Sequence, residues 1–272
     1  MSLRFLWIAV ILLAGCTAPA PPSDVTVMTF NIRYASPDDG VDVWANRKDW
    51  VAALIDSSAA DIIGLQEVLQ GQLEGILSRT DRFDWEGVGR DDGATQGEYS
   101  PILYDRTRFE RLDGGTRWLS PHPDSVGSRG WDAALPRIAT WVTLRERASG
   151  REFKVWNTHF DHRGEEARRE SARLVASWMT DGDVALGDLN ALPQSDPWRE
   201  LTGAGLVDTG AVAGQDTVGT FRTFDPASDV SNRIDYVFLA PGRELVDYAV
   251  LDPIVGGRYP SDHLPVRVTF RR

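Results

Sequence analysis

Cysteine is nearly absent from this 272-residue sequence, which contains only Cys16. A single cysteine excludes a disulfide within the chain, and it also excludes a zinc site built on a pair of cysteines. Positive charge is scarce as well, because 29 Lys and Arg residues stand against 40 Asp and Glu residues, for a formal net charge of −11. Attraction to nucleic acid comes mainly from Lys and Arg that neutralise phosphates, so a nuclease becomes a less favoured class.

Long hydrophobic runs are missing too. The apolar run over residues 5–13 is too short to span a bilayer, and with Arg4 before it the run is typical of a signal peptide. The run ends in Leu-Ala-Gly-Cys, which resembles the bacterial lipobox, where the cysteine is acylated and becomes the mature N-terminus. We therefore expect a lipoprotein signal peptide over residues 1–15 and a lipid on Cys16. An ordinary secretory signal with a chance cysteine is the alternative.

The rest of the composition fits one globular body. Hydrophobic residues make up 42% and charged residues 25%, which excludes fibrous and wholly disordered classes and provides for a sizeable core. Three prolines predict a short extended tether over residues 16–23. No second linker and no repeat follow, so we expect one domain over residues 24–272, and a monomer.

Short runs rich in β-branched and aromatic residues alternate with stretches of helical spacing. The predicted strands cover residues 25–30, 62–65, 102–104, 138–144, 153–157, 184–186, 234–239 and 266–270. Apolar residues at helical spacing predict helices around residues 50–55, 69–77 and 165–179, the last with charge pairs on a solvated face.

Polar side chains follow several of these strands directly. They are carboxylates, amides and imidazoles, namely Asn31, Glu67, His159, Asp188 and Asn190, while Asp262 and His263 precede the last strand. Each has an ordinary explanation when taken singly, since Gly-Asp-x-Asn, for example, is a good turn after any strand. Together they suit Mg²⁺ or Ca²⁺, and loops after strand ends can point such side chains into one cleft.

Six stretches of the chain resemble the ordered motifs of the endonuclease/exonuclease/phosphatase superfamily, which has the deoxyribonuclease-I-like fold. In chain order they read TFNIR from Thr29, LQEV from Leu65, NTHF from Asn157, GDLN from Gly187, RIDY from Arg233 and SDHLPV from Ser261. They cover about residues 25–270, and residues 97–162 are similar to a bacterial secreted branch of that superfamily. The resemblance implies a single-domain α+β fold, a four-layer αββα sandwich with a cleft at one end of two packed sheets.

The resemblance also implies a metal site. Glu67, assisted by Asn31, would hold a divalent cation, and Asp262 would be a second ligand or contact a metal-bound water. Mg²⁺ is the expected cofactor, with Mn²⁺ or Ca²⁺ as alternatives.

The same resemblance assigns five catalytic roles. Asp188 would position and deprotonate the attacking water, and Asn190 would bind the developing oxyanion. His159 and His263 would flank the phosphate as donors, and Asp235 would accept a hydrogen bond from one imidazole and orient it.

The residues expected to bind substrate lie mostly between the second and third motifs, where specificity loops are common. Arg137 could clamp a phosphate or form a structural salt bridge, and Tyr99 and Trp131 could contact the rest of the substrate, although a buried loop anchor is the alternative for the tryptophan. Arg33 stands where some nuclease members carry an acidic residue. It could serve an anionic substrate or pair with a surface acid.

The expected function is hydrolysis of a phosphodiester or phosphomonoester by in-line water attack outside the cytoplasm. The expected substrate is a small or lipid-linked phosphoester, and the expected membrane attachment is the lipid on Cys16, at the outer membrane if the host is Gram-negative. The alternatives are an extracytoplasmic nuclease that scavenges DNA or RNA and a catalytically inactive binding module of the same fold.

Overall fold

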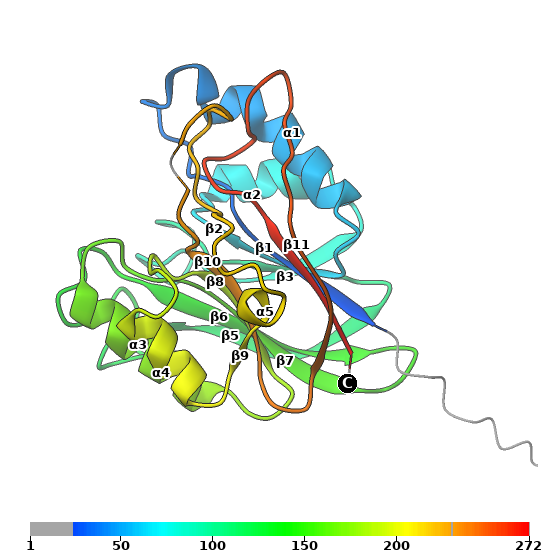
Figure 1. The fold of residues 1–272 in the computed structure, drawn as a ribbon, viewed down its shortest axis with the longest axis vertical. Coiled ribbons are helices and arrows are strands. Elements are labelled where there is room, and N and C mark those ends of the chain that lie inside the picture. The colour runs from blue at the N-terminus through cyan, green and yellow to red at the C-terminus, as the bar shows by residue number, and fades with distance from the viewer. Residues whose placement is uncertain (1–23, 230, 272) are drawn as a thin grey trace, which may run out of the picture.

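Two six-stranded sheets packed face to face form the centre of the structure (Figure 1). The computed structural model describes residues 24–229 and 231–271. The first sheet contains β1 (Val25–Asn31), β2 (Ile62–Gln66), β3 (Phe83–Glu86), β4 (Ile102–Asp105), β11 (Glu244–Val250) and β12 (Val266–Arg271). The second contains β5 (Phe109–Trp118), β6 (Ile138–Glu146), β7 (Glu152–His159), β8 (Val184–Asp188), β9 (Val207–Asp208) and β10 (Asp235–Leu239).

Helices cover the outer face of each sheet. These are α1 (Trp44–Ser57) and α2 (Gln70–Leu77) on the first sheet, and α3 (Glu165–Trp178) and α4 (Asp196–Gly203) on the second. Two short helices, η1 (Gly40–Asp42) and α5 (Thr209–Val212), lie in connections. One apolar core separates the two sheets and another lies under each helical layer. The predicted four-layer αββα sandwich is therefore confirmed.

The eight predicted strands and three predicted helices are all present, whereas four further strands were not predicted. Those four are β3, β5, β9 and β11, and each lies at the edge of a sheet, because the strand orders are β11-β12-β1-β2-β4-β3 and β5-β6-β7-β8-β10-β9. An edge strand is partly exposed and does not need a continuous apolar run. β11, for example, has no buried residue, whereas every residue of β2 is buried.

The N-terminal predictions fall outside the described residues. The expected signal peptide over residues 1–15, the lipidated Cys16 and the tether over residues 16–23 all lie there. Within residues 24–229 and 231–271, no helix combines the length and the apolar character that crossing a bilayer requires.

The topology brings the polar strand ends together. β1 is parallel to β2 and β7 is parallel to β8, while β12 is antiparallel to β1 and β10 is antiparallel to β8. The register pairs Asn31 with Gln66, and it pairs Asp188 with both His159 and Asp235. The carboxyl ends of four strands and the amino ends of two therefore meet at one end of the sandwich.

A buried arginine of α1 holds the backbone segments at this end of the sandwich in place. Arg47 is 1% exposed, and its guanidinium donates to the backbone carbonyls of Ile32 (2.6 Å), Arg33 (2.9 Å), Asp42 (2.6 Å) and Pro260 (3.0 Å). Burial lowers the pKa of Arg47 to about 10, so the group stays charged at neutral pH. One side chain thus joins the segment after β1 to the segment before β12.

We expect Arg47→Met to lower the free energy of unfolding by about 3 kcal/mol or more, because several buried carbonyls lose their donor. Urea denaturation followed by circular dichroism measures the change. Arg79→Met is the control, since Arg79 forms a surface ion pair with Asp49 (2.7 Å), and such pairs contribute less than about 1 kcal/mol. Equal midpoints for the two variants would contradict the role given to Arg47.

Candidate active site

A cleft of about 710 Å³ opens where the strand ends meet. Seven of the predicted site residues line it, namely Glu67, Arg137, His159, Asp188, Asn190, Asp262 and His263. Two more, Asn31 and Asp235, are fully buried and hydrogen-bond to residues that line the cleft. Residues far apart in the sequence are therefore brought to one place, as predicted.

Asp188, at the end of β8, is the centre of the site. Its Oδ2 accepts a hydrogen bond from Asn31 Nδ2 (3.0 Å), and its Oδ1 accepts one from the backbone N–H of Asn190 (2.8 Å). The Nε2 atoms of His159 and His263 lie 3.5 and 3.8 Å from Asp188 Oδ2. Burial and the charge of a neighbouring carboxylate raise the pKa of Asp188 to about 7, although His263 and the two hydrogen bonds oppose the shift.

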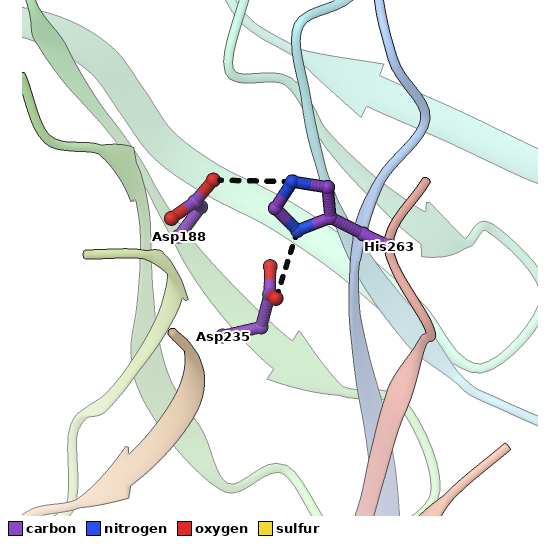
Figure 2. A group of neighbouring side chains, drawn as sticks. All are labelled: Asp188, Asp235 and His263. Carbon is purple, nitrogen blue, oxygen red and sulfur yellow. Dashed lines mark hydrogen bonds and ion pairs between the residues drawn. The ribbon is translucent and has the colours of Figure 1, made fainter. Parts of the chain in front are cut away.

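His263 and Asp235 form a buried pair beside Asp188. Figure 2 shows the imidazole between the two carboxylates, with His263 Nδ1 2.9 Å from Asp235 Oδ2. Burial alone would lower the pKa of His263, but the charges of Asp235 and Asp188 raise it well above its usual value. The ring is therefore protonated at neutral pH, and it is a donor at both nitrogens. Phe221 packs edge-on against it, with ring centres 5.1 Å apart.

Glu67 follows β2 directly and points back over the end of the sheet. Its backbone is left-handed (φ 59°), its Oε1 accepts from Asn31 Nδ2 (3.1 Å), and its Oε2 accepts from the N–H of Tyr34 (3.1 Å). Asn31 therefore bridges Glu67 and Asp188 and orients both carboxylates. Arg33 pairs with Asp39 (2.9 Å), which is the ion pair considered for it, and it also lies 4.0 Å from Glu67 and lines the cleft.

The donor set fits a divalent cation. Glu67 and Asp262 both line the cleft, and burial together with the charge of Glu67 raises the pKa of Asp262. Carboxylate oxygens crowded in this way are ligands that Mg²⁺ prefers, and a cation would neutralise their charge. A second group, Asp188, Asp235 and His263, has ligand atoms within 4.8 Å of one another, but the protonated imidazole of His263 has no lone pair to offer a metal. In that group Asp235 Oδ1 is buried without a hydrogen-bond partner among the described residues.

The wall opposite Glu67 is built by Arg137, which precedes β6. Its Nε donates to Asp161 Oδ2 (3.4 Å), and its two terminal nitrogens lie 3.1 and 2.9 Å from the Nδ1 atoms of His159 and His162. Its side chain is 5% exposed. The arginine therefore forms the structural ion pair considered for it, and it lines the cleft as well.

Glu98 lines the cleft and was not predicted. It forms a two-point pair with Arg90 (2.7 and 2.9 Å), and one of its oxygens lies 3.9 Å from both His159 Nδ1 and Arg137 Nη1. The backbone of Tyr99 bridges to that of Val68 in an extended arrangement. Neighbouring side chains in extended backbone point to opposite faces. The sequence signal for Glu98 was therefore its position next to Tyr99, an aromatic residue that is buried.

Neither Tyr99 nor Trp131 lines the cleft, which corrects the substrate-binding role predicted for each. Tyr99 is 1% exposed and packs in the core under α1 and α2, with its hydroxyl hydrogen-bonded to Gln70 and to the carbonyl of Ala94. Trp131 is half-buried beside Asp132, whose carboxylate accepts from an amide in the first turn of α3 (2.7 Å).

Comparison with known proteins agrees with the family resemblance that the sequence motifs indicated. The Endonuclease/Exonuclease/phosphatase family model matches residues 28–263. An endonuclease/exonuclease/phosphatase family protein from Bacteroides thetaiotaomicron is 35% identical, with 92% of this chain and 98% of that chain covered and a TM-score of 0.86. A mannosyl-6-phosphatase from the same organism is 34% identical, with 90% and 99% covered and a TM-score of 0.83.

A more distant curated relative is Nocturnin from Drosophila melanogaster, which is 24% identical. The match covers 94% of this chain but 48% of that protein. Members of the matched family include phosphatases and nucleases, which are phosphoric ester hydrolases. The extent of the family match and the arrangement of the cleft lead to one conclusion: the chain belongs to the endonuclease/exonuclease/phosphatase family.

Proposed function

We propose that the protein is a metal-dependent phosphatase that hydrolyses a soluble phosphomonoester, such as a sugar phosphate, outside the cytoplasm. The observation that carries the proposal is the setting of Asp188, a buried carboxylate with a pKa near 7 beside a protonated histidine. A general base works best when its pKa lies near the operating pH. The 34% identity to a mannosyl-6-phosphatase supports the substrate class.

Asp188 and the residues around it each have one role in an in-line displacement. Asp188 accepts a proton from the attacking water, and Asn31 and the Asn190 amide hold its carboxylate in place. His263 donates from Nε2 to a phosphoryl oxygen, while Asp235 holds its Nδ1. When bound at Glu67 and Asp262, a divalent cation supplies Lewis-acid neutralisation of the phosphoryl charge, and the family generally uses such a metal.

The charge distribution favours a small substrate over a nucleic acid. The chain carries a net charge of −11, so it offers little overall electrostatic attraction to the phosphates of a long polyanion. Leu135 and Leu192 are 38% and 51% exposed at the rim of the same cleft. An apolar rim over a polar floor suits a sugar ring that carries one phosphate.

The first test is a matrix of metals and substrates with the purified protein. We expect hydrolysis of a hexose 6-phosphate with Mg²⁺, its loss with a chelator, and slower or no cleavage of plasmid DNA. Asp188→Asn should lower the rate by about 10² to 10³, as does loss of a single group that acts in a transition state. Asp196→Asn, an exposed residue of α4, is the control. Full activity of Asp188→Asn would remove the basis of the proposal.

The pH profile tests the role of the His263–Asp235 pair. His263 acts as a protonated donor, so activity should fall as the pH rises through its pKa. Asp235→Asn removes the carboxylate that raises this pKa, and the alkaline limb should move to lower pH by about one to three pH units. The logarithm of kcat/KM measured from pH 5 to 10 shows the shift. An unchanged alkaline limb would mean that another group sets it.

The third test uses vesicles that carry the full-length acylated protein. We expect faster hydrolysis of a hexose 6-phosphate in the medium than of phosphatidic acid in the same vesicle, because the proposed substrate is soluble. Cys16→Ser protein, which cannot be acylated, should show the same rate on the soluble substrate. Faster hydrolysis of phosphatidic acid would contradict the proposed substrate class.

A further inference from the structure

The guanidinium of Arg137 contacts two imidazoles of the cleft at the same ring atom. Nη1 lies 3.1 Å from His159 Nδ1 and Nη2 lies 2.9 Å from His162 Nδ1, while Nε donates to Asp161. Three of the five N–H groups of this guanidinium are thus engaged within the protein. With a side chain that is 5% exposed, Arg137 has little capacity left to clamp a substrate phosphate itself.

Hydrogen-bond chemistry decides the state of His162. A guanidinium has only donors, so the Nδ1 that faces it must carry a lone pair. A protonated imidazole has no lone pair, and a neutral imidazole has one N–H and one acceptor nitrogen. His162 must therefore be neutral with the proton on Nε2. Burial and the charge of Arg137 lower the pKa of His162, in agreement with this state. His159 meets a donor at each nitrogen, Arg137 Nη1 at Nδ1 and Asn190 Nδ2 at Nε2, so its tautomer is not fixed in this way.

We propose that Arg137 is a positioning residue that locks His162 in the Nε2–H tautomer and so makes it a neutral donor to a phosphate in the cleft. Arg137 Nη2 holds the ring at Nδ1 (2.9 Å), and Asp161 holds the guanidinium at Nε (3.4 Å).

His162 differs from the other two cleft histidines in its exposure. His159 and His263 are 6% and 5% exposed, whereas His162 is exposed and lines the cleft. Its ring is nevertheless fixed at one edge by Arg137, so the opposite edge presents Nε2–H at the mouth. The role of His162 toward phosphate rests on the proposed function, whereas the tautomer of its ring does not.

Nitrogen NMR of the intact protein tests the tautomer. The chain has four histidines, which His→Asn variants assign, and a ring nitrogen without a proton resonates far downfield of a protonated one. At pH 7 we expect an unprotonated Nδ1 and a protonated Nε2 in His162. A protonated Nδ1 in this ring would overturn the proposal without any variant, and it would leave the proposed hydrolysis unaffected.

Two matched variants extend the test. Arg137→Gln should release His162 into a mixture of tautomers, whereas Arg163→Gln, which removes an exposed arginine next to His162, should leave the His162 spectrum unchanged. His162→Asn should weaken the binding of inorganic phosphate in the presence of Mg²⁺ by about tenfold, as expected for one lost hydrogen bond to a charged group. Unchanged phosphate affinity would overturn the donor role, and unchanged tautomers in Arg137→Gln would overturn the positioning role.

Discussion

Buried amide side chains join the two sheets at the end that carries the cleft. Asn31 in the first sheet donates to Asp188 in the second (3.0 Å), and Gln66 donates to Asn157 across the same interface (2.6 Å). The interior between the sheets is filled by apolar side chains, and an ion pair between Arg111 of β5 and Glu86 of β3 joins them at one edge. Hydrogen bonds fix distance and direction more narrowly than apolar contacts do, and a buried partner left alone would cost about 1–3 kcal/mol. The site spans both sheets, so its geometry depends on these bonds.

The same scaffold surrounds its two buried cleft histidines with opposite charges. His263 faces the carboxylates of Asp235 and Asp188, which raise its pKa, whereas His159 faces the guanidinium of Arg137, which together with burial lowers its pKa. Both Nε2 atoms lie within 4 Å of Asp188. A charged ring and a neutral ring therefore lie beside the same carboxylate. The difference comes from the partner at Nδ1, since the two rings are equally buried.

How much of the fold and of the site could be predicted from the sequence depends on how deeply each strand is buried. The inner strands are covered on both faces, and their apolar runs were predicted, whereas the partly exposed edge strands carry no such run. Residues directly after the inner strands, such as Glu67 and Asp188, were found for the same reason. Glu98 was missed because it lies in extended chain outside the twelve strands, and its neighbour Tyr99 was chosen although it faces the core.

Left-handed backbone at the strand ends explains why the polar residues turn into the cleft. Glu67 and Asn190 have φ values of 59° and 47°, which cost a non-glycine residue of order 1–3 kcal/mol each. The turn directs Glu67 over the end of β2, where its carboxylate accepts from Asn31 and Tyr34. At Asn190 the left-handed residue is the donor, and its backbone N–H donates to the carboxylate of Asp188. The hydrogen bonds that shape the site therefore also offset the strain that creates it, so the loss of either carboxylate would relax the backbone that positions the other groups.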